Sequence, residues 1–163
     1  MTADNTARRL IVMRHATSSW ISGAHLDHQR PLNQTGRPEP ASIAAQLAEI
    51  GWQPDLVLSS DSRRTTETWQ RMADGLPEID VHFKRELYHA GFEAFERQVG
   101  AVDASFRTVL VLGHNPGWEA VVEELGRQFV RMAPAHAALL VGRGATWWDA
   151  LADGWGLEHV LTP

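Results

Sequence analysis

The stretch that decides the fold runs from Arg9 to Trp20 and reads RLIVMRHATSSW. Its first part is a short apolar, β-branched run, which is typical of a strand buried on both faces of a sheet. The run ends in Arg14 and His15, a cation followed by an imidazole. Ligands of open α/β sheets bind outside the carboxyl ends of the strands, so this pair stands where such a fold places a site.

Small polar residues follow this predicted strand end. The backbone amides and hydroxyls of Thr17, Ser18 and Ser19 could bind an anion as the chain turns into its next element. Two simpler interpretations stay open at this point: Arg14 and His15 close an exposed strand end, and the hydroxyls only form a turn. The rest of the chain has to decide between them.

The composition restricts the class of protein. At 163 residues the chain fits one domain, residues 1–163, which is long enough to bury a core without disulfides or metals. The formal net charge of −5 disfavours a nucleic-acid binder or a membrane-surface binder. No cysteine is present, which excludes disulfides, thiolate metal sites and cysteine nucleophiles. The first residues are polar and no membrane-length apolar run follows, so we expect a cytoplasmic monomer without membrane association.

Apolar runs and helical patterns alternate along the rest of the chain. Turn formers predict a loop over 21–35, with Thr35 as a candidate cap for the next helix. Ser60 or Asp61 is the candidate cap for the helix that carries Arg64. Further strands are predicted at 54–60, 79–83 and 108–113, and helices at about 40–50, 63–68, 92–102 and 118–125. The last quarter predicts strands or hairpins flanking the sheet, at 137–141, 145–148 and 156–161.

This alternation favours an α/β fold with three layers, in which a mostly parallel central sheet carries helices on both faces. The ends of three strands then bring Arg14 and His15, Ser60 and Arg64, and His114 toward one edge. Clustered cations repel one another unless an anion brings them together, so these residues are poorly explained as ordinary exposed side chains. The strand ends therefore predict an anion site.

Two imidazoles and two guanidiniums, without a clear carboxylate cluster, favour phosphoryl transfer through a phosphohistidine over metal-assisted hydrolysis. A guanidinium group can donate two parallel hydrogen bonds to a phosphate group, and a neutral imidazole nitrogen is a competent nucleophile toward phosphorus. His15 is the predicted nucleophile. Arg14, Arg64 and His114 are predicted to surround the phosphoryl oxygens and to stabilise the charge of the transition state. This chemistry needs no metal and no cofactor.

The same residues carry a resemblance to a known family. Three segments, RHA at 14–16, SDSRRTTET at 60–68 and GHNP at 113–116, resemble the signature segments of the histidine phosphatase superfamily, whose fold is phosphoglycerate-mutase-like. The segment DHQRPL at 27–32, the pair Leu87-Tyr88 and the short chain are similar to the SixA-like phosphohistidine phosphatases. The resemblance covers residues 9 to about 120. It implies that His15 is transiently phosphorylated while Arg14, Arg64 and His114 bind the phosphoryl group.

The resemblance also selects between two neighbouring arginines. The family's arginine stands four residues after a serine and four before a threonine, and Ser60 and Thr68 satisfy this spacing for Arg64. Arg63 is then expected to face solvent, and the reverse assignment stays open.

The general acid is the point at which the sequence departs from the resemblance. Relatives that cleave alkyl phosphates carry a Glu or Asp between the second and third segments, and the near match here is Glu86. An alkoxide leaving group needs that proton, whereas a protonated phosphoramidate nitrogen leaves more readily. A weak or absent acid would therefore favour phosphohistidine over a sugar phosphate.

The expected function is that of a metal-independent phosphatase that acts through phospho-His15. The favoured substrate is a phosphorylated protein histidine, such as that of a phosphotransfer domain. One alternative is a small-molecule phosphomonoesterase of the same superfamily. Another, from a different class, is a non-catalytic module that binds phosphate or a phosphoprotein.

Overall fold

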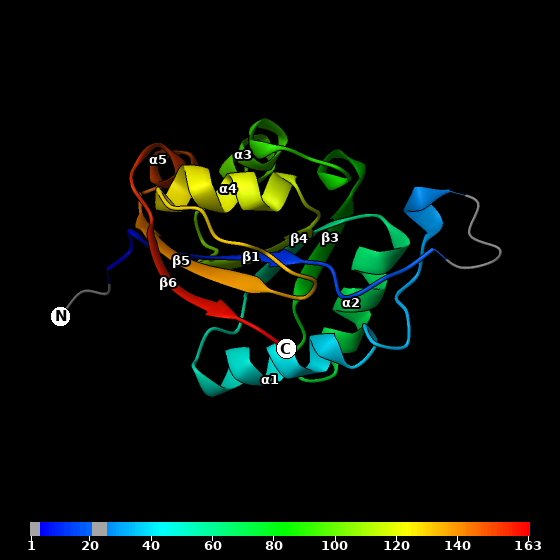
Figure 1. Cartoon of the computed structure of the whole chain (residues 1–163). Helices are drawn as coiled ribbons and strands as arrows, with labels where there is room; N and C mark the ends of the chain where they lie inside the picture. The colour runs from blue at the N-terminus through cyan, green and yellow to red at the C-terminus, as the bar shows by residue number, and fades with distance from the viewer. Residues whose placement is uncertain (1–3, 21–25) are drawn as a thin grey trace.

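The computed structural model describes residues 4–20 and 26–163, and residues 21–25 of the predicted loop lie outside the described part. A six-stranded sheet runs through the molecule, with helices on both faces (Figure 1). The strands are β1 (Ala7–Arg14), β2 (Leu56–Ser60), β3 (Asp80–Lys84), β4 (Thr108–Gly113), β5 (Ala137–Arg143) and β6 (Gly156–Leu161). The helices are α1 (Glu39–Glu49), α2 (Arg63–Ala73), α3 (Phe92–Gly100), α4 (Gly117–Gly126) and α5 (Trp147–Ala152), and two 3-10 turns are η1 (Asp27–Gln29) and η2 (Arg85–Leu87).

The strand order in the sheet is β3-β2-β4-β1-β5-β6. The first four of these strands pair in parallel, whereas β5 runs antiparallel to both β1 and β6. The sheet is therefore mostly parallel, which confirms the predicted α/β fold. Because β1 and β4 are parallel neighbours with Arg14 opposite Gly113, the residues that follow both strands leave the sheet at one edge.

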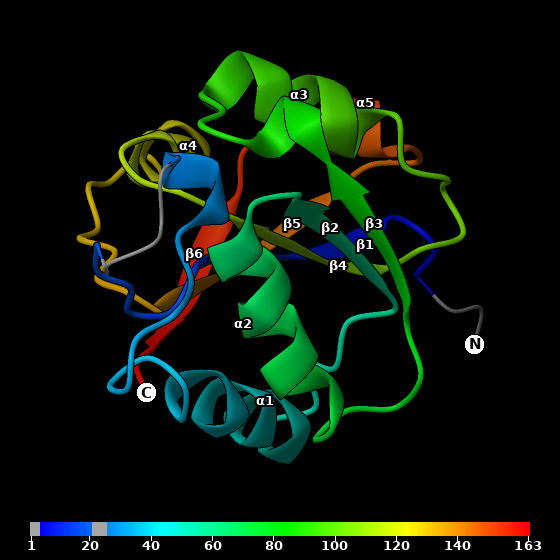
Figure 2. The same cartoon turned by 90° about the vertical axis from the view of Figure 1, so that its right-hand side faces the viewer.

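β1 lies between two apolar cores. Leu10 and Val12 pack on one face with residues of α3, α4 and α5, while Ile11 and Met13 pack on the other with residues of α1 and α2. All four side chains are fully buried, and each stabilises the fold by about 2 kcal/mol. Figures 1 and 2 show the same division, with α3, α4 and α5 on one side of the sheet and α1 and α2 on the other.

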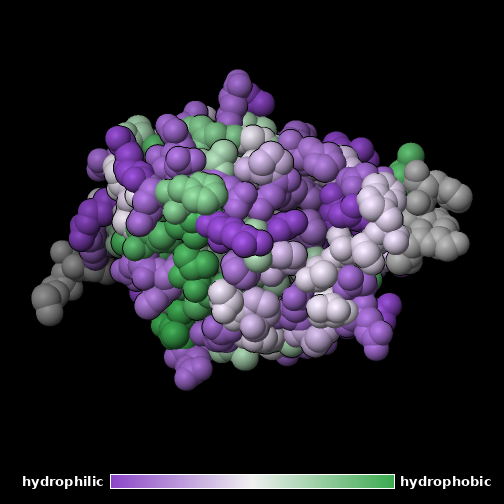
Figure 3. Space-filling view, in the orientation of Figure 1, coloured by the Kyte–Doolittle hydropathy of each residue, from purple (hydrophilic) through white to green (hydrophobic). Residues whose placement is uncertain are grey.

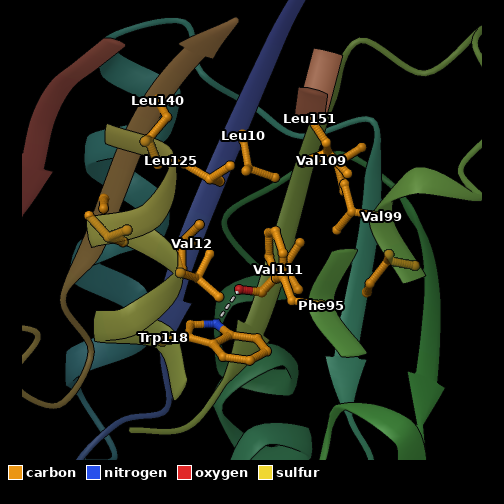
Figure 4. Close-up of a cluster of buried hydrophobic side chains, with 14 of the residues drawn as sticks. Leu10, Val12, Phe95, Val99, Val109, Val111, Trp118, Leu125, Leu140 and Leu151 are labelled. Carbon is orange, nitrogen blue, oxygen red and sulfur yellow. Dashed lines mark hydrogen bonds between the residues drawn. The ribbon is translucent and has the colours of Figure 1, made fainter. Parts of the chain in front are cut away.

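Trp118 of α4 joins the first of these cores to β4 (Figure 4). Its indole Nε1 donates a hydrogen bond of 3.0 Å to the carbonyl oxygen of Val111, and its ring lies edge-on to Phe95 with centroids 5.7 Å apart. The same indole lies against Gly113, where an added Cβ would stand 2.4 Å from the ring. This close packing holds α4 against the end of β4, next to His114.

The prediction of a strand at 145–148 is wrong. This segment leads into α5, which begins after Thr146. The Asp149 amide donates to the Thr146 hydroxyl at 3.1 Å, and the Thr146 amide donates to the Asp149 carboxylate at 3.2 Å. This reciprocal capping box satisfies amides at the helix start that have no partner within the helix, and Trp147 is buried behind it.

Two predicted helix caps also differ from the structure. α1 starts at Glu39 after Pro38, so Thr35 lies outside the helix. Ser62, rather than Ser60 or Asp61, caps α2, and its hydroxyl accepts a hydrogen bond from the Thr65 amide. Ser60 is instead used at the candidate site.

Hydrophilic residues cover most of the face seen in Figure 3, and the apolar residues of this face lie mainly over the edge strand β6. Leu157 and Leu161 of this strand are partly buried against the two cores. Within the described residues, no helix combines the length and apolar character needed to cross a membrane.

Candidate active site

Two histidines lie side by side where β1 and β4 end. The His15 amide donates to the carbonyl oxygen of Gly113 at 3.0 Å, and the rings of His15 and His114 have centroids 5.3 Å apart. Both side chains are buried. The parallel pairing of β1 with β4 thus brings together two residues that are about 100 positions apart in the sequence.

His15 is held in one protonation state. Its Nδ1 lies 2.7 Å from the carbonyl oxygen of Ala16, and because a carbonyl only accepts, the proton is on Nδ1 and the lone pair is on Nε2. Burial lowers the pKa of His15 to about 3, assisted by the positive charges of Arg64, Arg14 and Arg30 and opposed by the bond to Ala16. The imidazole is therefore neutral at physiological pH, with Nε2 available as a nucleophile.

His114 is also neutral. Its Nε2 lies 2.8 Å from the hydroxyl oxygen of Ser60 at the end of β2. Burial, together with the neighbouring His15 and Arg64, lowers its pKa to about 2. Its Nδ1 is buried and has no hydrogen-bond partner among the described residues.

Three guanidinium groups face this pair. Arg14 ends β1, Arg64 lies in the first turn of α2, and Arg30 follows η1. The positive charge of each lowers the pKa of His15, which places all three within its electrostatic reach. Their Nε atoms are buried donors and have no acceptor in residues 4–20 and 26–163. Buried donors are normally paired, so this group of donors suits an anion with several oxygens.

Arg30 was not among the predicted site residues. Its Nη2 donates to the hydroxyl of Ser18 at 3.0 Å, and its guanidinium lies over the ring of Trp20 at 5.1 Å. Arg30 belongs to the DHQRPL segment, whose charge and family resemblance were the sequence signals for it.

The two arginines at the start of α2 differ in their surroundings. Arg64 is buried, with Nη1 donating to the main-chain oxygen of Asp27 at 2.7 Å and Nη2 to its carboxylate at 2.9 Å. Arg63 is exposed and pairs with Glu67 at 2.7 Å. Thr68 connects Arg64 to the segment after β1, because its hydroxyl donates to the Arg64 carbonyl and accepts from the Ala16 amide. The structure thus brings Arg64, and not Arg63, to the histidines.

A carboxylate that the sequence analysis did not select lies at the mouth of the cluster. Oδ2 of Asp27 accepts hydrogen bonds from Arg64, from the Tyr88 hydroxyl at 2.5 Å and from Nε2 of His89 at 2.9 Å. Partial burial raises the pKa of Asp27, but these hydrogen bonds and the charge of Arg64 outweigh it and hold the pKa well below its usual range. Asp27 is therefore ionised at physiological pH. Figure 2 shows η1, which contains Asp27, beside the start of α2.

The profile of the histidine phosphatase superfamily (branch 1) matches residues 10–137. The chain belongs to this superfamily. An uncharacterized chloroplastic protein of Arabidopsis thaliana is 36% identical over 96% of this chain and 78% of its own length.

Solved structures place this histidine phosphatase in the SixA-like branch. A protein of Nakamurella multipartitia named after the phosphohistidine phosphatase SixA is 31% identical, with a TM-score of 0.87 and 96% of each chain covered. A protein of Agrobacterium tumefaciens with the same name is 28% identical, with a TM-score of 0.81, covering 96% of this chain and 98% of its own. The fold is therefore phosphoglycerate-mutase-like, as the resemblance implied.

Glu86, the predicted general acid of the histidine phosphatase, is not brought into the cluster. It lies in η2 with its side chain exposed, and within the described residues no hydrogen bond or ion pair joins it to the site. Its catalytic role stays a prediction that no contact supports. Tyr88 and His89, two and three residues later, hold the nearby positions instead.

The three hydroxyl residues after His15 have mixed surroundings. Both the amide and the hydroxyl of Thr17 donate to the Glu39 carboxylate, at 2.7 and 3.0 Å, so its amide is already paired. Ser18 accepts from Arg30, and Ser19 accepts from Asn33 at 3.5 Å. Ser18 thus lies nearest to the guanidinium groups and acts on the site through Arg30.

Proposed function

We propose that this protein is a phosphatase that forms a covalent phosphohistidine on His15. One observation carries the proposal: a neutral imidazole with its lone pair on Nε2 lies among three guanidiniums whose buried Nε donors have no acceptor among the described residues. A phosphoryl group would supply the acceptor oxygens and would place phosphorus next to the nucleophile.

The reaction proceeds by two in-line displacements. In the first, the Nε2 lone pair of His15 forms a bond to phosphorus as the bond to the leaving group breaks. The new phosphoimidazole is cationic, and the hydrogen bond from Nδ1 to the Ala16 carbonyl stabilises that charge. In the second, water attacks phosphorus, the bond to Nε2 breaks, and inorganic phosphate leaves.

Arg14, Arg30, Arg64 and His114 stabilise the charge on the equatorial oxygens in both steps. Their contribution is electrostatic, because the transition state is loose and its charge is spread over these oxygens. The orienting bonds from Asp27 and from the Met132 carbonyl, which accepts from Arg14 at 3.2 Å, hold two of the guanidiniums in place before substrate binds. No step requires a metal or a cofactor.

The favoured substrate is a phosphohistidine on a protein, such as a phosphotransfer domain. Two relatives are named after a phosphohistidine phosphatase, which supports this choice. We infer that the protein acts as a monomer in the cytoplasm on such a partner.

The test is release of phosphate, with EDTA present, from a phosphohistidine-bearing phosphotransfer domain and from a panel of sugar phosphates. His15→Ala should abolish release, and His82→Ala, which removes an exposed histidine of β3, should leave it unchanged. EDTA-resistant, His15-dependent release from phosphohistidine alone supports the proposal. Preference for sugar phosphates would instead indicate a small-molecule phosphomonoesterase, and phosphate or vanadate binding without any release would indicate a binding module.

A further inference from the structure

His89 is a half-exposed histidine that the mechanism above does not use. It lies between η2 and α3, and its ring centroid is 5.4 Å from that of His114 and 4.0 Å from that of Tyr88. Its backbone has a φ of 53°, in the left-handed region that residues other than glycine rarely adopt. Such positions persist where surrounding contacts hold them, and they are frequent at functional sites.

Close packing holds the backbone next to His89. Gly117, the first residue of α4, lies so near the carbonyl oxygen of Ala90 that an added Cβ would be 1.8 Å from it. This contact packs the segment between η2 and α3, which contains His89, against the loop between β4 and α4, which contains His114. The two histidines therefore approach each other because their backbones are packed together.

Asp27 orients the His89 ring. The carboxylate only accepts, so the bond of 2.9 Å to Nε2 of His89 requires a proton on that nitrogen. Tyr88 and Arg64 donate to the same carboxylate oxygen and hold it in place. The other ring nitrogen, Nδ1, has no hydrogen-bond partner in the described part of the chain, and the side chain is half-exposed. Histidines that transfer protons have this arrangement, in which a carboxylate binds one ring nitrogen and the other ring nitrogen is left for the substrate.

We propose that Nδ1 of His89, oriented by Asp27, gives a proton to the leaving group when His15 is phosphorylated; the inference rests on the proposed function. The proton moves from the His89 imidazolium to the leaving oxygen or nitrogen as its bond to phosphorus breaks. His89 then stays neutral, with its proton on Nε2. In the second displacement Nδ1 takes a proton from the attacking water, which restores the imidazolium.

His114 is a poorer candidate for this role. It is neutral at physiological pH, so giving up a proton would leave an imidazolate in a buried site. It acts as a hydrogen-bonding group toward the phosphoryl oxygens. Glu86 is exposed and has no contact with the cluster among the described residues. His89 combines exposure to solvent with proximity to both histidine and arginine groups of the site.

The charged and titratable groups that face His89 come from three other elements. Asp27 of η1 is negative, Arg64 of α2 is positive, and His114 after β4 is neutral. Tyr88 adjoins it in the chain and stays protonated, because burial and the bond to Asp27 raise its pKa. The one direct ionic contact of His89 in the described residues is thus the favourable one to Asp27, which orients the ring.

The experiment measures kcat/KM for p-nitrophenyl, phenyl and alkyl phosphates, whose leaving groups are progressively worse. His89→Asn is the informative variant, because asparagine adopts the left-handed conformation and can still bond Asp27 but has no proton to transfer. For phenyl and alkyl phosphates His89→Asn should lower kcat/KM about 100-fold, with little effect on p-nitrophenyl phosphate, whose leaving group needs no proton. His82→Asn is the matched control and should change neither.

Asp27→Asn should produce the same dependence on the leaving group, and combining it with His89→Asn should not steepen that dependence further. If His89→Asn lowered kcat/KM equally for all three esters, or for none of them, the role of His89 would be overturned. A wild-type protein that releases phosphate neither from a phosphohistidine-bearing phosphotransfer domain nor from any of these esters, or that does so equally well as His15→Ala, would instead contradict the proposed function. The two failures are therefore distinguishable.

Discussion

Replacing His15 with asparagine should make the folded protein less sensitive to acid. The folded protein holds His15 neutral with a pKa of about 3, and it holds His114 neutral with a pKa of about 2. In the unfolded chain both imidazoles regain an ordinary pKa of about 6.5. Between these values the unfolded state binds more protons than the folded state, so the free energy of unfolding decreases as the pH falls below about 6.5.

The size of this effect follows from the unfolded pKa alone, since neither histidine is appreciably protonated in the fold at pH 5. Lowering the pH from 7 to 5 stabilises the unfolded chain by about 2 kcal/mol for each histidine, or about 4 kcal/mol for the pair. His15→Asn removes one of the two contributions. The variant should therefore lose about 2 kcal/mol less than the wild type over this interval.

The assay is urea unfolding at pH 7 and pH 5, followed by the fluorescence of the seven tryptophans. Other groups that titrate in this range contribute equally to wild type and variant, so the difference between the two proteins isolates His15. His82→Asn controls for the loss of any histidine from the surface of β3. If His15→Asn lost as much stability as the wild type, His15 would not be held neutral, and its assignment as nucleophile would fail.

Three further changes test the surrounding structure. Arg8→Met should lower the free energy of unfolding by about 4 kcal/mol in urea titrations, because the buried guanidinium donates to four main-chain carbonyls that would lose their partners. Gly117→Ala should destabilise the protein by about 2 kcal/mol and lower its phosphatase activity, since the new Cβ forces α4 away from Ala90; unchanged activity would show that this contact does not position the site. Arg30→Ala should weaken vanadate binding by about 30-fold in calorimetric titrations through loss of a charge-assisted donor, and unchanged affinity would exclude Arg30 from the anion site.

The parts of the site that lie at strand ends could be predicted from the sequence. β1 and β4 are apolar runs that end in polar residues, and parallel pairing places such ends at one edge. Arg14, His15 and His114 could therefore be grouped from their positions in the sequence. Arg64 was selected over Arg63 by family spacing, and the burial of Arg64 agrees with that choice.

The parts of the site contributed by loops could not be predicted in the same way. Asp27 lies in η1, Arg30 is the residue after it, and His89 has a left-handed backbone in the link that follows η2. Neither segment has the periodicity that predicts an element, and their positions depend on contacts with α2 and α4. The family resemblance pointed to Glu86, which lies in η2 next to Tyr88 and His89 but makes no contact with the cluster among the described residues.

The misassigned segment 145–148 shows a different limit. Its aromatic and small residues fit a strand as well as a helix when only the local composition is considered. The Thr146 and Asp149 pair, at the spacing of a capping box, was the signal that separates the two. Here the capping residues predict the element better than the apolar run does.

The central claim is that His15 becomes phosphorylated during turnover, and trapping that intermediate tests it most directly. The protein would be mixed with a ³²P-labelled substrate, quenched in alkali within milliseconds, and digested for peptide mapping. The account predicts a label that is stable in alkali, is lost in acid, maps to His15 and is absent from His15→Ala. Turnover at the wild-type rate by His15→Ala, or a label on any other residue, would contradict it.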